Sequence, residues 1–291
     1  MKIKTWITRF AAVLSVLAAP VAQAATNAGV PALRVTAPDG ESSILIGSAH
    51  VSAKGMLQPD ASIFTGARRY VTEHLGLPQP GDQGAGGALA PWAANLTQEE
   101  VATYLERASC AGYTTDDALS LLRRPSAQFA NQIAYTTCER VAGVPDRDTV
   151  IWSFKPASVP EGFLEDDAAV EATRRSVPPH LTDLSFKWAL AHDPRKVMAD
   201  IGDAVNRGDY DTIRTIFVES LGDPRNAEAF SKIMVDGRNA AWMPRLKQFL
   251  DEGHAVIVVG AMHLPGENGL IQKLRDDGYR VDAVTLPALP E

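Results

Sequence analysis

The sequence predicts an α/β (α+β) fold in which duplicated β-turn-α-β units form a central mixed sheet, with a large helical insertion between them. Two observations support this prediction. The heptad ILIGSAH at residues 44–50 recurs as IVVGAMH at residues 257–263, and each copy reads as a strand that runs into Gly-x-x-His. Between the copies, apolar residues recur at helical spacing and prolines interrupt the pattern repeatedly.

The N-terminus has the pattern of a secretory signal peptide. A basic start is followed by a short apolar stretch at residues 10–19 and by the small residues of Ala22-Gln23-Ala24. This pattern predicts a signal peptide over residues 1–24, cleaved after Ala24, and therefore a periplasmic or secreted protein. The apolar stretch is shorter than the ~20 residues that span a bilayer, so we expect no stable membrane insertion.

The composition of the remaining chain, residues 25–291, limits its partners. It keeps 25 basic against 35 acidic residues, a net charge near −10, which disfavours nucleic-acid binding. A hydrophobic content of 45% is ordinary for a globular domain. In an oxidising compartment Cys110 and Cys138 are candidates for one disulfide, although two separate buried thiols would also fit. No sequence pattern assigns an oligomeric state.

The first half of the predicted domain covers residues 25–77 and ends in a polar residue of interest. Its expected elements are strands at 33–37, 43–46 and 70–72 and a short helix at 60–68. Glu73 directly follows the last of these strands. Residues 78–96 then form a Gly/Pro-rich loop, and we expect its part from Pro78 to Pro91 to be mobile.

The helical insertion covers residues 97–237, and the second half of the domain covers residues 238–291. Thr97 and Glu100 have the spacing of a capping box, which predicts the first helix of the insertion. The second half begins with an amphipathic helix. A strand at 255–259, a helix at 270–274 and a strand at 280–284 follow it.

The two Gly-x-x-His motifs predict a shared site. If the two strands lie side by side, His50 and His263 project above the same sheet edge. Neutral imidazole is a common metal ligand, and Glu73 would add a carboxylate, so we expect His50, Glu73 and His263 to bind a divalent Mn, Co, Fe or Zn ion. A single such histidine would more often only hydrogen-bond across a loop, but the duplication favours a functional pair. His74 points to the opposite strand face and is interpreted as exposed or structural.

These residues carry a resemblance to a known family. The stretches concerned are Gly47-Ser48-Ala49-His50 and Glu73 in the first half, and Arg238-Asn239-Ala240-Ala241-Trp242, Val259–Leu270 and Gly278-Tyr279 in the second. They resemble the TraB/GumN family, which is related to the Tiki metalloproteases and more distantly to erythromycin-esterase-like and ChaN-like proteins. The resemblance implies that His50, Glu73 and His263 hold a metal and that Arg238 and Asn239 complete the site.

The leading hypothesis is a metal-dependent hydrolase, with a peptide or another small amide-containing molecule as substrate. In this hypothesis the catalytic residues are Glu73, Arg238, Asn239 and His263, and Arg238 stabilises charge developing on a carbonyl oxygen. One alternative is a non-catalytic binding protein for a peptide, haem or glycan, because paired histidines also ligate haem iron. Another is an accessory protein in envelope or exopolysaccharide assembly, which the GumN resemblance alone suggests.

Overall fold

The computed structural model describes residues 29–50, 52–75, 87–138 and 145–290, so the predicted signal peptide lies outside the described ranges. Within them, six strands form one mixed sheet in the order β4-β3-β5-β2-β1-β6. The strands are β1 (Val30–Thr36), β2 (Ser42–Ser48), β3 (Arg69–Thr72), β4 (Glu161–Phe163), β5 (Ala255–Gly260) and β6 (Arg280–Leu286). The predicted α/β class is confirmed.

The two strands that carry the repeated heptads are parallel neighbours at the centre of the sheet. β2 and β5 pair with Gly47 opposite Val259 and Ser48 opposite Gly260, so the two motifs are offset by one residue. β1 and β2 form an antiparallel hairpin, and β3 pairs with the other side of β5. The carboxyl ends of β2, β5 and β3 therefore meet at one sheet edge.

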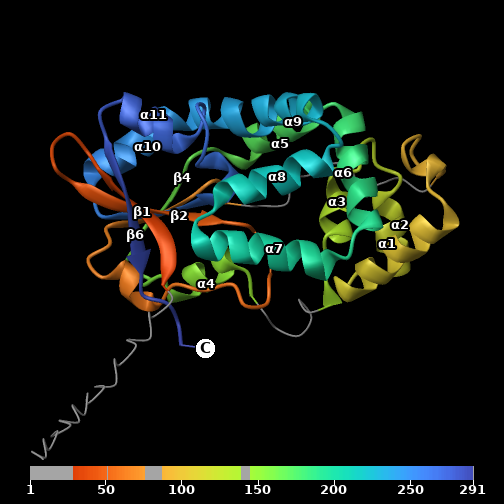
Figure 1. The fold of residues 1–291 in the computed structure, drawn as a ribbon, viewed down its shortest axis with the longest axis horizontal. Coiled ribbons are helices and arrows are strands. Elements are labelled where there is room, and N and C mark those ends of the chain that lie inside the picture. Colours follow the sequence, from red (N-terminus) through yellow and green to blue (C-terminus); the bar gives the residue numbers. More distant parts are fainter. Residues whose placement is uncertain (1–28, 51, 76–86, 139–144, 291) are drawn as a thin grey trace, which may run out of the picture.

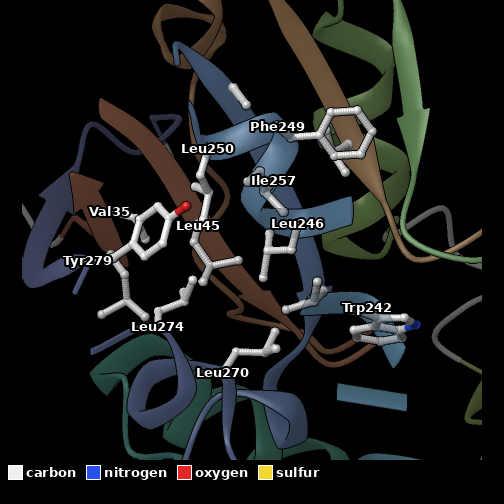
Figure 2. Packing of buried hydrophobic residues seen from close by; sticks show 14 of the residues in the cluster. Val35, Leu45, Trp242, Leu246, Phe249, Leu250, Ile257, Leu270, Leu274 and Tyr279 are labelled. Atoms are coloured by element: carbon white, nitrogen blue, oxygen red, sulfur yellow. The ribbon is translucent and has the colours of Figure 1, made fainter. Parts of the chain in front are cut away.

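Helices cover both faces of the sheet. Alternate residues of β5 point to opposite sides, so its apolar side chains pack against helices on each face. Ile257 and Val259 pack against α10 (Arg238–Glu252) and α11 (Leu270–Asp276), which contribute Leu246 and Leu270 to the core in Figure 2. The other face packs against α4 (Arg147–Phe154) and the 3-10 helix η1 (Ala61–Phe64). β5 itself is buried along its whole length, as its continuous apolar sequence predicts.

Part of the insertion forms a second group of helices beside the sheet, on the right in Figure 1. Its core contains residues of α1 (Gln98–Cys110), α2 (Thr115–Leu121), α3 (Gln128–Ala134) and α6 (Pro179–Ala191). The Thr97–Glu100 capping box is confirmed at the start of α1. Cys110 and Cys138 form a disulfide.

The remaining helices connect this group with the sheet. They are α5 (Asp167–Ser176), α7 (Pro194–Arg207), α8 (Tyr210–Ser220), α9 (Pro224–Ser231) and the π-helix η4 (Lys232–Gly237), which runs directly into α10. Prolines that interrupt the sequence pattern stand at the first position of α6, α7 and α9, where the missing N–H costs no hydrogen bond. In the described part of the chain, no helix has both the length and the apolar character needed to cross a membrane.

Two details differ from the sequence-based expectations. The helix expected at 60–68 is only the 3-10 helix Ala61–Phe64, because Gly66 adopts a positive φ of 74° and ends it. The insertion also contributes an edge strand, β4. This strand was not predicted, because its three residues are too few to show an alternating pattern. At the start of the Gly/Pro-rich loop, residues 78–86 lie outside the described ranges, whereas Ala90 and Trp92 further along are buried in the helical core.

Candidate active site

His50 stands just beyond the end of β2 in a backbone conformation that few non-glycine residues adopt. Its φ is 54°, in the left-handed region, and its side chain is 49% exposed. The ring Nδ1 lies 3.1 Å from Oδ2 of Asp148, and the hydroxyl of Ser48 donates to the same carboxylate oxygen. The imidazole is therefore held from its Nδ1 side, with Nε2 directed towards Glu73.

Asp148 belongs to the first turn of α4, in the insertion, and was missed by sequence reasoning. Its neighbour Arg147 is buried and donates from Nη1 to the carbonyl oxygen of Gly47 at 2.8 Å and from Nη2 to that of Leu57 at 2.7 Å. These two adjacent residues fix both the turn that carries His50 and the orientation of its ring. They lie about a hundred residues from the motif, and no local pattern links them to it.

Glu73 is buried at the end of β3 and is contacted from three sides. Its Oε1 accepts a hydrogen bond from the backbone N–H of Gly260 at 2.7 Å, and its Oε2 accepts one from Nη2 of Arg238 at 2.7 Å. The Nε2 atoms of His50 and His263 lie 3.4 Å and 3.8 Å from Oε1. Both histidines thus converge on the same carboxylate oxygen. His74, the next residue, instead pairs with Asp167, which fits a structural role.

His263 is buried, and its surroundings define its protonation state. Nδ1 lies 2.7 Å from Oδ1 of Asn239, whose Nδ2 donates to the carbonyls of His263 and Asn268. Because Oδ1 can only accept, Nδ1 carries the proton and Nε2 keeps a lone pair. Burial lowers the pKa of His263 to about 4, so the ring is neutral at ordinary pH.

Arg238 begins α10 and is buried between two carboxylates. It donates to Glu73 and, through Nε at 2.9 Å and through Nη2, to Glu165, a second residue that sequence reasoning missed. Its guanidinium lies 4.6 Å from the ring centroid of Trp242, and that ring lies 4.3 Å from the His263 ring. The same helix turn therefore holds Arg238, Asn239 and one wall of the His263 pocket.

The charges of the cluster shift the pKa values of its members. Partial burial lowers the pKa of His50, but hydrogen bonds to Asp148 and Glu73, together with their negative charges, raise it well above its usual value. Burial raises the pKa of Glu73, but the hydrogen bond with His50 and the charges of His50 and Arg238 hold it well below its usual value. Arg238 is paired with Glu73 and Glu165, whereas Asp148 faces His50 and has Arg147 as its neighbour.

Gly260 makes the close approach of these groups possible. A Cβ atom at this position would lie 2.9 Å from Nε2 of His50 and 3.3 Å from Oε1 of Glu73. The first contact is shorter than packed atoms tolerate, and the second is tight enough that the neighbouring group must shift slightly. The second Gly-x-x-His motif therefore needs its glycine to leave room for the side chains of the other half of the sheet.

The donor chemistry of the cluster fits a divalent metal, with one rearrangement. As placed, the described residues contain no group of three His, Cys, Asp or Glu side chains ready to hold a metal ion. However, both imidazoles are held through Nδ1 and present Nε2 to one carboxylate oxygen, the usual arrangement of metal-binding histidines and their supporting partners. The rearrangement concerns Arg238, whose Nη1 lies 3.3 Å from Nε2 of His263. This N–H group would have to move away before the Nε2 lone pair could bind a metal.

The comparisons with known proteins agree with the motifs. The model of the TraB/PrgY/gumN family matches residues 32–283. The chain belongs to this family. The match spans the helical middle of this TraB/PrgY/gumN member as well as the two ends that carry the resemblance, and it includes the five predicted site residues. No curated protein and no solved structure matches significantly.

Proposed function

We propose that this TraB/PrgY/gumN member is a hydrolase that cleaves an amide bond, in the first place a peptide bond, at the cluster of His50, Glu73 and His263. One observation carries the proposal: two imidazoles, each held through Nδ1, direct Nε2 at the same oxygen of a buried carboxylate. A purely structural pair of histidines has no need of this convergence, and two imidazoles with a carboxylate are a donor set suited to a divalent metal.

His50 Nε2, Glu73 Oε1 and His263 Nε2 are the atoms that we expect to hold the metal. When bound, a divalent ion would supply Lewis-acid polarisation of a carbonyl and a bound water of lowered pKa. Asp148 and Asn239 fix the two rings through Nδ1, and Gly260 N–H orients Glu73. Arg238, once released from His263 Nε2, is positioned to hold negative charge that develops on a substrate oxygen.

We also propose a periplasmic or secreted location. The pattern of residues 1–24 supports it, as does the Cys110–Cys138 disulfide, because such bonds persist mainly in oxidising compartments.

Metal content tests the proposed function directly. The mature wild-type protein and the variants His50→Ala and His263→Ala would be stripped with chelator and reloaded separately with Mn, Co, Fe(II) or Zn. The metal bound per chain would then be measured by plasma mass spectrometry. His192→Ala, which alters an exposed histidine that stacks on Trp188 and takes no part in the cluster, is the matched control. We expect about one metal per chain in wild type and control, and loss of that metal in both site variants.

A peptidase and esterase screen would then follow on the loaded protein. Equal, negligible metal in all four proteins would contradict the metal-dependent mechanism. Stoichiometric metal without turnover of any peptide or ester would support the binding-protein alternative instead.

A further inference from the structure

Arg238 contacts two of the expected metal ligands and also Glu165, which is not one of them. Its Nε, at 2.9 Å, and its Nη2 both donate to Oε1 of Glu165. Nη2 also donates to Oε2 of Glu73 at 2.7 Å. Nη1 lies 3.3 Å from Nε2 of His263 and 3.4 Å from the carbonyl oxygen of Met234. The guanidinium is therefore shared between the expected metal donors and two acceptors, Glu165 and Met234, that would not bind the metal.

The contact with Glu165 holds the guanidinium most strongly. Two N–H groups meet one carboxylate there, and hydrogen bonds between charged partners are stronger than bonds to neutral groups. The two contacts of Nη1 involve neutral groups and are long for hydrogen bonds. Because the Glu165 contacts converge on the single atom Oε1, the guanidinium can turn about that atom. Such a turn would take Nη1 away from His263 without breaking the ion pair with Glu165.

Glu165 is itself fixed to the strand that carries Glu73. It lies two residues after the end of β4, and its backbone N–H donates to the carbonyl oxygen of Glu73 at 2.9 Å. Its side chain is only 9% exposed, and among the described residues its ion-pair partner is Arg238. The Glu165 carboxylate can therefore keep its place when the groups around it rearrange.

A divalent ion at the cluster would change the balance of charge around Arg238. The carboxylate of Glu73 would be engaged by the ion and would balance the guanidinium less, and the two cations would repel each other. A buried cation without a counter-ion is costly, so the metal-bound cluster needs a second carboxylate beside Arg238. Glu165 is already in contact with the guanidinium and meets this need.

We propose that Glu165 is a positioning residue for metal binding: it retains Arg238 while the guanidinium gives up Nε2 of His263. Nε and Nη2 stay on Glu165, and Nη1 keeps the carbonyl oxygen of Met234 as an acceptor. Arg238 thus remains beside the site, available to a substrate oxygen, without occupying a donor that the metal needs. This inference rests on the proposed function for the metal and adds the residue that controls access to it.

A double-mutant cycle on metal affinity tests this role. Zn²⁺ is the probe, because it should bind these donors more tightly than Mn, Fe or Co, and its affinity would be measured by competition with a chromophoric chelator. We expect Glu165→Gln to weaken Zn²⁺ binding by about 10- to 100-fold, the range for residues that support metal ligands. In an Arg238→Gln background the same change should weaken binding by less than about threefold, because Glu165 acts through Arg238.

Glu171→Gln is the matched control for the cycle. Glu171 is a buried glutamate that pairs with Arg175 at 3.2 Å within α5, outside the cluster, so this substitution should leave Zn²⁺ affinity unchanged. A direct attraction between Glu165 and the ion would instead give equal losses with and without Arg238. Equal losses in the two backgrounds, or a loss in the control as large as in Glu165→Gln, would overturn the proposal.

A second measurement uses the wild-type protein and needs no variant to fold. The Nε–H group of Arg238 can be followed by ¹H–¹⁵N NMR with and without Zn²⁺, which is diamagnetic. We expect slow exchange of this proton with water in both states, because the bond to Oε1 of Glu165 persists. Rapid exchange that appears only after Zn²⁺ loading would show that the arginine leaves Glu165, and it would overturn the proposal.

Zn²⁺ binding by wild type separates this inference from the proposed function. A wild-type protein that binds none of the four candidate ions would contradict both. Stoichiometric Zn²⁺ in wild type, together with unchanged affinity in Glu165→Gln, would contradict only the role of Glu165 and would leave the metal site in place.

Discussion

Arg238 and His263 meet at the lone pair on which the proposed metal site depends: Nη1 of the arginine lies 3.3 Å from Nε2 of the histidine. A guanidinium cannot accept a hydrogen bond, so the contact requires an unprotonated Nε2. The same neutral form of the ring would bind a metal. His263 is therefore already in the protonation state that a metal ligand needs.

Arg238→Ala should destabilise the metal-free protein strongly. The substitution leaves Glu73 and Glu165 buried without their cation, and breaking a buried ion pair on one side typically costs about 3–5 kcal/mol. Urea unfolding of wild type and variant measures the difference. Arg245→Ala on the exposed side of the same helix should change the free energy of unfolding by less than about 1 kcal/mol. Equal effects of the two substitutions would contradict the buried pairing.

Asp148→Asn should lower the pKa of His50 in the metal-free protein. The carboxylate favours the protonated ring, and the neutral amide removes that charge. NMR titration of the imidazole C–H protons measures the shift, with His192 as the internal reference. A His50 pKa that does not fall in the variant would show that Asp148 is not its partner.

The raised pKa of His50 also predicts the sign of a stability change with pH. The folded protein binds this proton more tightly than the unfolded chain, whose histidine pKa is about 6.5. Its contribution to stability is therefore complete below that pH and is lost as pH rises through the higher folded-state pKa. The free energy of unfolding, measured across this pH range, should decline less in Asp148→Asn than in wild type. Identical pH profiles would contradict the coupling between Asp148 and the protonation of His50.

Gly260→Ala should impair metal loading more than it impairs folding. Its Cβ would intrude between His50 Nε2 and Glu73 Oε1, so the half-exposed His50 ring is the group most able to move away. We expect metal content to fall severalfold while thermal unfolding stays cooperative. Full metal loading in the variant would mean that the three donors do not converge at this point.

Removing the disulfide should destabilise the insertion. Cys110 and Cys138 are separated by 28 residues along the chain, and closing a loop of that size contributes about 3–4 kcal/mol in the chain-entropy treatment. The double variant Cys110→Ser/Cys138→Ser should unfold at lower denaturant concentration than the oxidised wild type. Reduced wild type should match the variant, and no difference between oxidised and reduced wild type would contradict a stabilising bond.

The sequence predicted the sheet centre and the convergence of the two histidines because both depend on local patterns. Strand β5 is a continuous apolar run, and each histidine follows a glycine at a strand end. Asp148 and Glu165 could not be predicted in the same way. They reach the site from the insertion, across long sequence separations, and their local surroundings show only helix starts and turns. The short edge strand β4 likewise carries too few residues to establish an alternating pattern.

The order of strands has a consequence for how the chain folds. β5, which begins at Ala255, lies between β3 and β2, so the two halves of the sheet cannot join until nearly the whole chain is present. A chain that stops before β5 would leave one side of β2 and of β3 unpaired, and such open edges promote association between chains. Completion of the sheet is thus a late event that links distant segments, and it should be slow relative to formation of the insertion helices.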